Sequence, residues 1–417
     1  MLNYLWEDVM KINAGDTAWV LMSAALVMFM VPGLALFYGG MVRAKNLLAM
    51  LMQNFFALGI VTVLWVIVGY SLAFGPGDFI GNFDYVGLKG LSTQVSEAGL
   101  PVLAFVAFQM TFAIITPALI TGAIADRMRW AAWVPFIVLW SILVYAPVAK
   151  WIFGGGWLAQ RGALDFAGGT VVHVNAGAAA LVLVLLLGRR KNWPRDPMPP
   201  HSLPLTLLGT GILWFGWFGF NAGSALAADG VAAQAFMNTF VAAAAGMLGW
   251  LIVERVKAGH ATTLGAASGA VAGLVAITPC AGFVGGLSPI IIGAIAGAVC
   301  YLAIWLKFHF KFDDSLDVIA VHLVGGIIGS VLLGFFADSA VNKLGKDGVF
   351  FGGGWSLVGE QILAVVVIMA FSMVVTLIIG LGLKKSLSKG IRVTSEEEEI
   401  GLDLTQHSEN AYSLERV

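Results

Sequence analysis

Hydrophobic residues in this chain fall into long blocks, and short polar or charged segments separate the blocks. Each block has roughly the twenty residues that an α-helix needs to cross the ~30 Å hydrocarbon core of a bilayer. Only helices and closed barrels satisfy every backbone hydrogen bond within lipid, and blocks of this length indicate helices. We therefore predict an all-α integral membrane protein with eleven transmembrane helices. The predicted spans cover residues 19–38, 47–74, 102–124, 130–148, 169–188, 203–221, 231–253, 262–278, 290–306, 318–336 and 357–383.

The positions of the basic residues predict how these spans are oriented. Lys and Arg concentrate in every second connection and in the C-terminal segment, for example at Arg43, Arg190 and Lys384, whereas the other connections hold few of them. Cytoplasmic loops are enriched in basic residues, so the connections that contain them should lie inside. With an odd number of spans, this bias places the N-terminus outside and the C-terminus inside.

Two segments of the sequence, 165–177 and 314–326, are copies of one design, and each contains a histidine in an otherwise apolar run. An alignment without gaps pairs Asp165 with Asp314, Val172 with Val321, His173 with His322, and Gly177 with Gly326. Such self-similarity indicates an internal repeat.

This repeat predicts the domain organisation. The two histidines fall in the fifth and tenth spans, so each half has five helices and the halves enter the membrane from opposite sides. We expect two five-helix inverted repeats at approximately 18–188 and 203–337, and then a final helix at approximately 357–383. Such folds place the substrate path near the midplane, where the halves meet. The transmembrane domain would cover residues 1–390, and a polar cytoplasmic tail would cover residues 391–417.

The composition supports a membrane protein and argues against other classes. The chain is 59% hydrophobic and 11% charged, with a formal net charge of -1, whereas soluble domains are about half apolar and a quarter charged. A net charge near zero without a basic stripe argues against a nucleic-acid partner. The two cysteines, Cys280 and Cys300, lie in or beside apolar runs, so we expect neither a disulfide framework nor a cysteine metal site.

His173 and His322 are the only histidines within the predicted spans. A single one could be a neutral core residue that a hydroxyl or a carbonyl satisfies. Two at matching repeat positions favour a shared functional site, because an ionisable side chain at membrane depth is costly and usually functional. A metal site is an alternative use, but no Cys, Glu or Asp lies beside them at membrane depth to complete the ligands. No nucleophile and base occur together, so we expect no enzyme activity, and we expect no cofactor.

Aromatic and acidic residues form two further groups of candidates. Residues such as Phe112 and the aromatic segment 217–224 more often serve in packing. An aromatic face can, however, replace part of the hydration of a small cation, and a desolvated contact of this kind contributes roughly 2 kcal/mol. Asp165 and Asp314 begin their helices, where a carboxylate cap is worth about 1 kcal/mol. Asp165 could in addition supply negative potential under an external cation site.

Several motifs together resemble the ammonium transporter family, Amt with its Mep and Rh relatives. They are residues 32–40, 165–173, 216–224, 317–322, 401–403 and 407–412, and the likeness extends over essentially the whole chain. The resemblance implies a homotrimer in which each eleven-helix subunit has its own narrow apolar pore, with His173 and His322 as pore lining and proton relay. It implies a stacked gate of Phe112 and Phe220. The expected ammonium recruitment site above that gate contains Ser224, Phe112, Trp217 and Phe153.

Phe153 departs from the family pattern, which usually has tryptophan immediately before the three glycines of the outer loop. A phenyl face is a weaker cation partner than indole and lacks its N–H. We therefore expect a weakened outer site, unless Trp151 or Trp157 substitutes.

These observations predict ammonium transport across the cytoplasmic (inner) membrane, with deprotonation near the gate and passage of ammonia through the pore. Ammonium and potassium are similar in size and charge, but only ammonium can leave its charge behind as a proton. An apolar pore enforces this difference, because a bare cation is heavily penalised in a low dielectric and neutral ammonia is not. We expect methylammonium as a further substrate. The alternative is an ammonium sensor, or transceptor, that acts mainly through a PII-type signalling protein at the cytoplasmic face, as the family-like tail implies.

Overall fold

The structure, a computed structural model, describes residues 12–412, and every regular element among them is helical. Ten helices, some built from consecutive segments, are long and apolar enough to cross a membrane, and Thr263–Ile277 is a shorter apolar helix. The chain is therefore an all-α multi-pass membrane protein, as predicted. Its sidedness stays a prediction, and the ends of the predicted domains, residues 1–11 and 413–417, lie outside the described residues.

The helices follow the predicted spans closely. The first half contains α1 (Ala14–Met41), α2 (Leu47–Leu64), α3 (Tyr70–Phe74), α4 (Val102–Ile124), α5 (Trp130–Trp140), α6 (Ala146–Ile152), α7 (Trp157–Arg161) and α8 (Asn175–Leu187). The second half contains α9 (Leu203–Ala222), α10 (Gly230–Ala258), α11 (Thr263–Ile277), α12 (Ser288–Ala303), α13 (Trp305–His309) and α14 (Gly325–Phe336). The remaining helices are α15 (Ser356–Ser386), α16 (Ser395–Ile400) and α17 (Leu402–His407).

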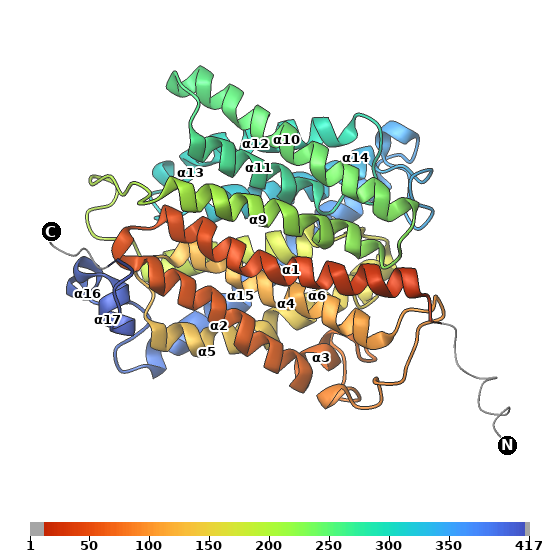
Figure 1. Cartoon of the computed structure of the whole chain (residues 1–417), viewed down its shortest axis with the longest axis horizontal. Coiled ribbons are helices and arrows are strands. Elements are labelled where there is room, and N and C mark those ends of the chain that lie inside the picture. Colours follow the sequence, from red (N-terminus) through yellow and green to blue (C-terminus); the bar gives the residue numbers. More distant parts are fainter. Residues whose placement is uncertain (1–11, 413–417) are drawn as a thin grey trace.

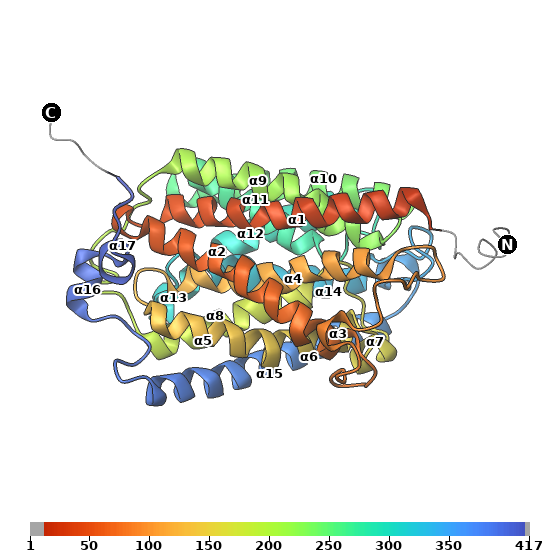
Figure 2. The same cartoon turned by 60° about the horizontal axis from the view of Figure 1, so that its bottom comes forward.

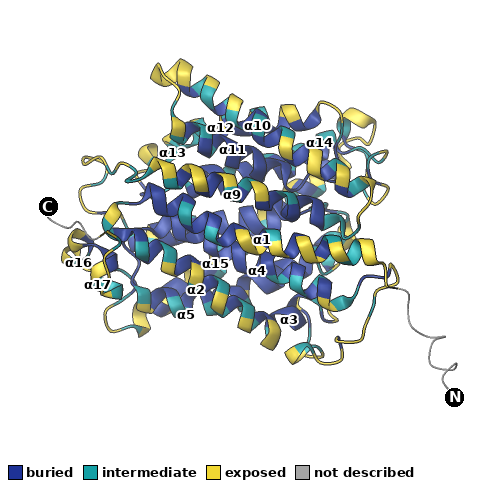
Figure 3. Ribbon diagram, viewed as in Figure 1, coloured by how far each residue is buried: buried dark blue, intermediate teal, exposed yellow. Residues whose placement is uncertain are grey.

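The long helices run side by side, and the first and last described residues lie at opposite ends of the bundle (Figure 1). α1 packs along α9, and α10 packs against α11 and α12. The most apolar stretches of α4 and of the α8 span are 78% and 83% buried, against 33% for α15. α4 and α8 therefore form the centre, and Figure 3 shows α4 as mostly buried, whereas α15 lies along the outside (Figure 2).

Each repeat histidine lies in a π-helical turn, Gly169–Val174 before α8 and Ile319–Val324 before α14. The two helices touch through matched glycines. A Cβ at Gly177 would lie 2.6 Å from Cβ of Leu323, and a Cβ at Gly326 would lie 3.1 Å from Cγ2 of Val174. Leu323 is the repeat equivalent of Val174, so the contacts are reciprocal, and small residues permit this close backbone approach in lipid.

The tail folds back onto the end of the bundle where α1 and α2 meet (Figure 2). A single antiparallel bridge joins Met128 to Arg392, and Arg129 forms a bidentate ion pair with Glu397. Asp403 accepts a hydrogen bond from the backbone N–H of Ala49 at 2.8 Å. α2 has no local side-chain cap, so a residue far away in the sequence supplies one.

Candidate functional site

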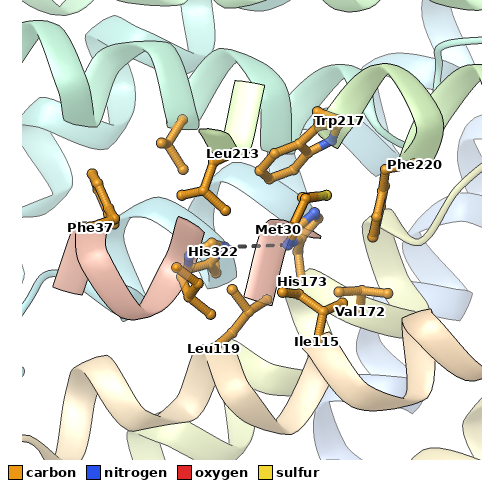
Figure 4. Close-up of a pocket in the computed structure, with 12 residues that line it drawn as sticks. Met30, Phe37, Ile115, Leu119, Val172, His173, Leu213, Trp217, Phe220 and His322 are labelled. Atoms are coloured by element: carbon orange, nitrogen blue, oxygen red, sulfur yellow. Dashed lines mark hydrogen bonds between the residues drawn. The ribbon is translucent and has the colours of Figure 1, made fainter. Parts of the chain in front are cut away.

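A narrow cavity lies between the two histidine helices, α1, α4 and α9 (Figure 4). Its wall is aliphatic or aromatic apart from two imidazoles, with Met30, Leu34, Leu119 and Leu213 among the lining residues. The centre of a water-sized molecule has only about 10 Å³ of free space there. That is room for about one such molecule.

His173 and His322 meet in this cavity, as the repeat predicted. Their side chains are almost completely buried, with 1% and 2% of their surface exposed. The two Nδ1 atoms are 3.2 Å apart, and the rings lie at 19° with their centroids 5.3 Å apart. Because the same atom of each ring faces the other, one Nδ1 must carry a hydrogen and the other must accept it.

Tyr38 determines the direction of this hydrogen bond. Its hydroxyl lies 3.1 Å from the carbonyl oxygen of Leu119 and 3.4 Å from Nε2 of His322. The carbonyl can only accept, so it takes the single hydroxyl hydrogen, and the tyrosine oxygen accepts from Nε2–H of His322. His322 Nδ1 then bears a lone pair and accepts from Nδ1–H of His173.

The remaining ring nitrogen, Nε2 of His173, is buried and has no hydrogen-bond partner in the described part of the chain. With its other nitrogen protonated, this atom bears a lone pair. The chain of hydrogen bonds that starts at Leu119 therefore ends in one free acceptor at the cavity. Sequence reasoning missed Tyr38, although a hydroxyl inside an apolar span and inside the motif 32–40 was a signal that could have revealed it.

Phe112 and Phe220 lie beside the histidines and form the expected stack, with ring centroids 4.3 Å apart and planes at 27°. Phe220 also faces His173, at 6.2 Å between ring centroids. Both phenylalanines are fully buried. The stacked pair therefore closes one end of the cavity in this structure.

Trp217 is not where the resemblance placed it. Its ring lines the histidine cavity, 5.5 Å from His173 and nearly parallel to it, and its indole N–H donates to the hydroxyl of Thr278 at 2.9 Å. An α-helix rises ~1.5 Å per residue, so a residue seven positions before Ser224 lies about 10 Å deeper in the bundle. Trp217 is thus a wall of the inner cavity, and Thr278 is a partner that the sequence did not indicate.

Phe153 packs edge-on against Phe112, with ring centroids 6.0 Å apart and planes at 84°. Neither neighbouring tryptophan takes its place. Trp151 donates its indole N–H to the carbonyl of Phe79 and packs against Phe371, and Trp157 packs against Phe79 and Trp151. The third aromatic ring beside the gate is therefore a phenyl.

Ser224 and Asp165 both line a second, open cavity of about 580 Å³. The Ser224 hydroxyl donates to the carbonyl of Phe220 at 2.9 Å, so its oxygen presents only lone pairs to the cavity. This bond also links the rim of the open cavity to the backbone of the gate residue.

The carboxylate of Asp165 accepts five hydrogen bonds from residues 168–171, at 2.6 to 3.2 Å. Its repeat equivalent, Asp314, accepts one from the backbone of Ile319 at 2.7 Å, and its other oxygen is buried without a partner. Burial and the neighbouring Asp317 raise the pKa of Asp314 to about 6. Both residues have the geometry of a helix cap, but only in Asp165 do both carboxylate oxygens accept hydrogen bonds.

Among the described residues, no group of three or more His, Cys, Asp or Glu side chains is arranged to hold a metal ion. The site is thus an apolar cavity with a histidine pair at its centre, an aromatic stack at one end and a polar, open cavity beyond the stack.

Comparison with known proteins agrees with this architecture. A model of the Ammonium Transporter Family matches residues 18–412. Proteins named ammonium transporter from Mycobacterium tuberculosis and Bacillus subtilis are 50% and 51% identical, over 96% and 95% of this chain and 91% and 98% of theirs. The crystal structure of Saccharomyces cerevisiae Mep2 superposes with a TM-score of 0.87 at 37% identity, covering 94% of this chain and 93% of that one. A structure described as a sensor Amt protein gives a TM-score of 0.87 at 31% identity, over 94% and 98% of the two chains.

Proposed function

The chain belongs to the ammonium transporter family, and from this premise we propose that it takes up ammonium at the open cavity, removes a proton near the phenylalanine pair and conducts ammonia past the two histidines. One observation carries the proposal. The cavity has room for about one small molecule, an apolar wall and a single free nitrogen acceptor. These features fit a neutral hydrogen-bond donor of the size of ammonia and disfavour any bare cation.

Recruitment begins at Ser224, whose oxygen offers lone pairs to a cation. The negative charge of Asp165 lies at the same cavity, and its five hydrogen bonds keep it from binding the ion directly. Asp165 therefore attracts the cation through its electric field, and it holds the turn that leads to His173. Phe112 and Phe153 supply aromatic faces at the closed end of the pore.

The phenylalanine stack separates the hydrated ion from the dry cavity. At 4.3 Å between ring centroids no molecule fits between the two rings, so passage requires a ring to rotate. An ion that crosses this point must leave its water, and the cost of a bare charge in an apolar medium exceeds what a few ring contacts return. Ammonium avoids that cost by releasing a proton.

The histidine pair provides an acceptor for that proton or for an N–H of ammonia. A proton that arrives at Nε2 of His173 lets Nδ1–H of His173 move to Nδ1 of His322. His322 then carries the positive charge, and its Nε2–H stays hydrogen-bonded to the oxygen of Tyr38, which cannot take the proton because its own hydrogen is donated to Leu119. The transfer follows the existing hydrogen bond between the rings, and both rings are neutral again once the proton returns along the same path and leaves from Nε2 of His173.

We also propose the surroundings of this site. The protein spans the cytoplasmic membrane with its N-terminus outside and its tail inside, as the basic connections favour. It assembles as a homotrimer, and exposed aromatic side chains on α9 and α10, such as Phe215 and Phe240, fit burial in a subunit interface. The inverted repeats place the pore where the two halves cross.

The test is transport by purified protein in liposomes, recorded as currents on solid-supported membranes and as ammonia-driven pH change inside the vesicles. We expect signals with ammonium and, more weakly, with methylammonium, and none with potassium above protein-free liposomes. Potassium currents as large as the ammonium currents would contradict the proposed mechanism. A pH change without current would identify net transport of ammonia alone.

A sensing role is a second candidate, because the tail is docked against the bundle and one similar structure is described as a sensor Amt protein. In that case the main output would be binding of a cytoplasmic signalling protein to the tail. Deletion of residues 391–417 separates the roles. Loss of ammonium-dependent regulation with transport retained in vesicles would support sensing, whereas unchanged regulation would exclude it.

A further inference from the structure

Lys150 is the only buried lysine in the part of the chain that the structure describes, with 6% of its surface exposed. It belongs to α6, three residues before Phe153, and the span Trp130–Arg161 contains both. α3, α6 and α7 lie together at the end of the bundle where the described chain begins (Figure 2). An ionisable side chain within a membrane span is costly to bury and is usually functional. The transport path described above makes no use of this lysine.

Backbone carbonyls alone bind the ammonium group of Lys150. Its Nζ donates to the carbonyl oxygen of Gly75 at 2.9 Å and to that of Gly154 at 3.0 Å. No Asp or Glu in residues 12–412 forms an ion pair with it. Hydrogen bonds from a charged donor are roughly twice as strong as neutral ones. Since Gly75 is the residue that follows α3, the lysine joins the end of α3 to the loop after α6.

This loop fits closely against α3 and against the lysine itself. A Cβ at Gly154 would collide with the carbonyl oxygen of Ala73 and would lie 2.9 Å from Cδ of Lys150. The backbone N–H of Gly156 donates to the carbonyl oxygen of Lys150 at 2.9 Å. Both the side chain and the backbone of Lys150 therefore hold the residues that directly follow Phe153.

Phe153 is the C-cap residue of α6, so its backbone lies between the helix and the held Gly154. Its ring is half-buried and packs edge-on against Phe112 of the gate, with ring centroids 6.0 Å apart. An aromatic ring attracts a cation only when the ion lies over its face, within about 6 Å of the centroid. The position of this loop consequently determines whether the ring of Phe153 can face an ion above the gate.

We propose that Lys150 is a positioning residue of the ammonium recruitment site. By binding the carbonyls of Gly75 and Gly154, it holds Phe153 where the ring contacts the ion. This inference rests on the proposed function, because it takes Phe153 to be part of the recruitment site. The positive charge of Lys150 repels a nearby cation, so removal of the charge alone would strengthen ammonium binding. Loss of positioning would weaken binding, and the two effects therefore have opposite signs.

The experiment measures ammonium currents of full-length variants in proteoliposomes over a range of ammonium concentrations. Lys150→Met keeps the length of the side chain but has no donor. We expect it to raise the half-saturating concentration about fivefold, which corresponds to about 1 kcal/mol, and to change the maximal current less than about twofold, because the gate and the histidines stay intact. Lys150→Arg should restore the wild-type value, since a guanidinium can donate to both carbonyls. Lys89→Met is the matched control and should change neither quantity, because Lys89 is an exposed lysine in the loop before α4.

A second pair of variants tests whether Lys150 acts through Phe153. Phe153→Ala should raise the half-saturating concentration by a similar factor, and adding Lys150→Met to it should cause no further rise, because the ring is already absent. The same fivefold rise in both backgrounds would show that Lys150 acts independently of the ring, and would overturn the proposal. An unchanged or lower half-saturating concentration in Lys150→Met would also overturn it.

Two controls keep these outcomes distinct. All variants are compared as assembled protein on size-exclusion chromatography, and if Lys150→Met does not assemble, Lys150→Gln takes its place with the same expected direction. Glutamine is uncharged and shorter, so it cannot bridge the two carbonyls. An ammonium current that is selective over potassium, with a half-saturating concentration that does not depend on Lys150, refutes this inference alone. Potassium currents as large as the ammonium currents refute the proposed function.

Discussion

Replacing His322 with glutamate should convert the cavity from a filter for a neutral molecule into a site for a cation. The cavity has room for about one water-sized guest, so a guest touches the side chain at position 322. A unit charge about 4 Å from a carboxylate gains ~4 kcal/mol at an effective dielectric constant of 20. That energy corresponds to about a thousandfold in cation occupancy, since each 1.4 kcal/mol is tenfold. Desolvation of the ion removes part of the gain, and we expect potassium current to rise at least tenfold relative to ammonium current.

The assay is the pair of currents in proteoliposomes, with His322→Gln as the control. Glutamine has the same length as glutamate but no charge, so it should reduce ammonium transport without admitting potassium. A steric role for His322 predicts the same selectivity for both variants. If the assembled glutamate variant excludes potassium as well as the wild type does, the twin histidines are not the filter described above.

Four further predictions concern neighbours of the pair. Tyr38→Phe removes the acceptor for Nε2–H of His322, and a buried donor without a partner costs about 1 to 3 kcal/mol. We therefore expect the ammonium current to fall at least tenfold, whereas an unchanged current would mean that Tyr38 does not fix the tautomer of His322. Asp165→Asn loses a carboxylate that accepts five hydrogen bonds, so we expect less assembled protein on size-exclusion chromatography and a lower Tm. Asp314→Asn should cause neither loss, because the Asp314 carboxylate accepts only one hydrogen bond. The pKa of Asp314 is raised to about 6, so the folded state holds its proton more tightly than the unfolded chain, and the wild type loses stability as pH rises through about 6. Asp314→Asn should therefore gain more Tm over the wild type at pH 7 than at pH 5, and an equal gain at both would contradict the shift. Phe153→Trp should lower the ammonium concentration for half-maximal current a few-fold, because indole is the better cation partner, and no change would mean that this ring does not contact the ion.

The helices could be predicted from the sequence because a segment that crosses lipid must form all its backbone hydrogen bonds within itself. The length of an apolar block is therefore enough to identify a membrane-spanning helix. The predicted span 262–278 corresponds to Thr263–Ile277, and the predicted span 203–221 to Leu203–Ala222. The span at 130–148 was too short, since the helix continues through a π-helical turn, Ser141–Tyr145, and ends at Ile152. Hydrophobicity does not mark that turn, because its residues are as apolar as their neighbours.

The two histidines could also be predicted, because an ionisable side chain stands out against an apolar run and the repeat doubles the signal. The side chains that orient them could not. Tyr38, which bonds His322, and Thr278, which bonds the Trp217 ring beside His173, are both far from the histidines in the sequence, and a hydroxyl in an apolar segment is common. Trp217 was assigned to the wrong cavity because a motif gives the identity of its residues but not their depth along the helix.

The tail beyond residue 390 docks against the transmembrane bundle and completes the start of one of its helices. The first turn of α2 has free backbone donors, and Asp403 accepts from one of them, while Asn46 accepts from the backbone of Leu402 at 2.8 Å. A helix cap of this kind is worth about 1 kcal/mol. Loss of the tail would leave both groups without partners at the start of a span that packs against α4. Because α4 carries Phe112, the docked tail is connected through α2 to the helix of the gate, and a transporter and a sensor can use the same contact.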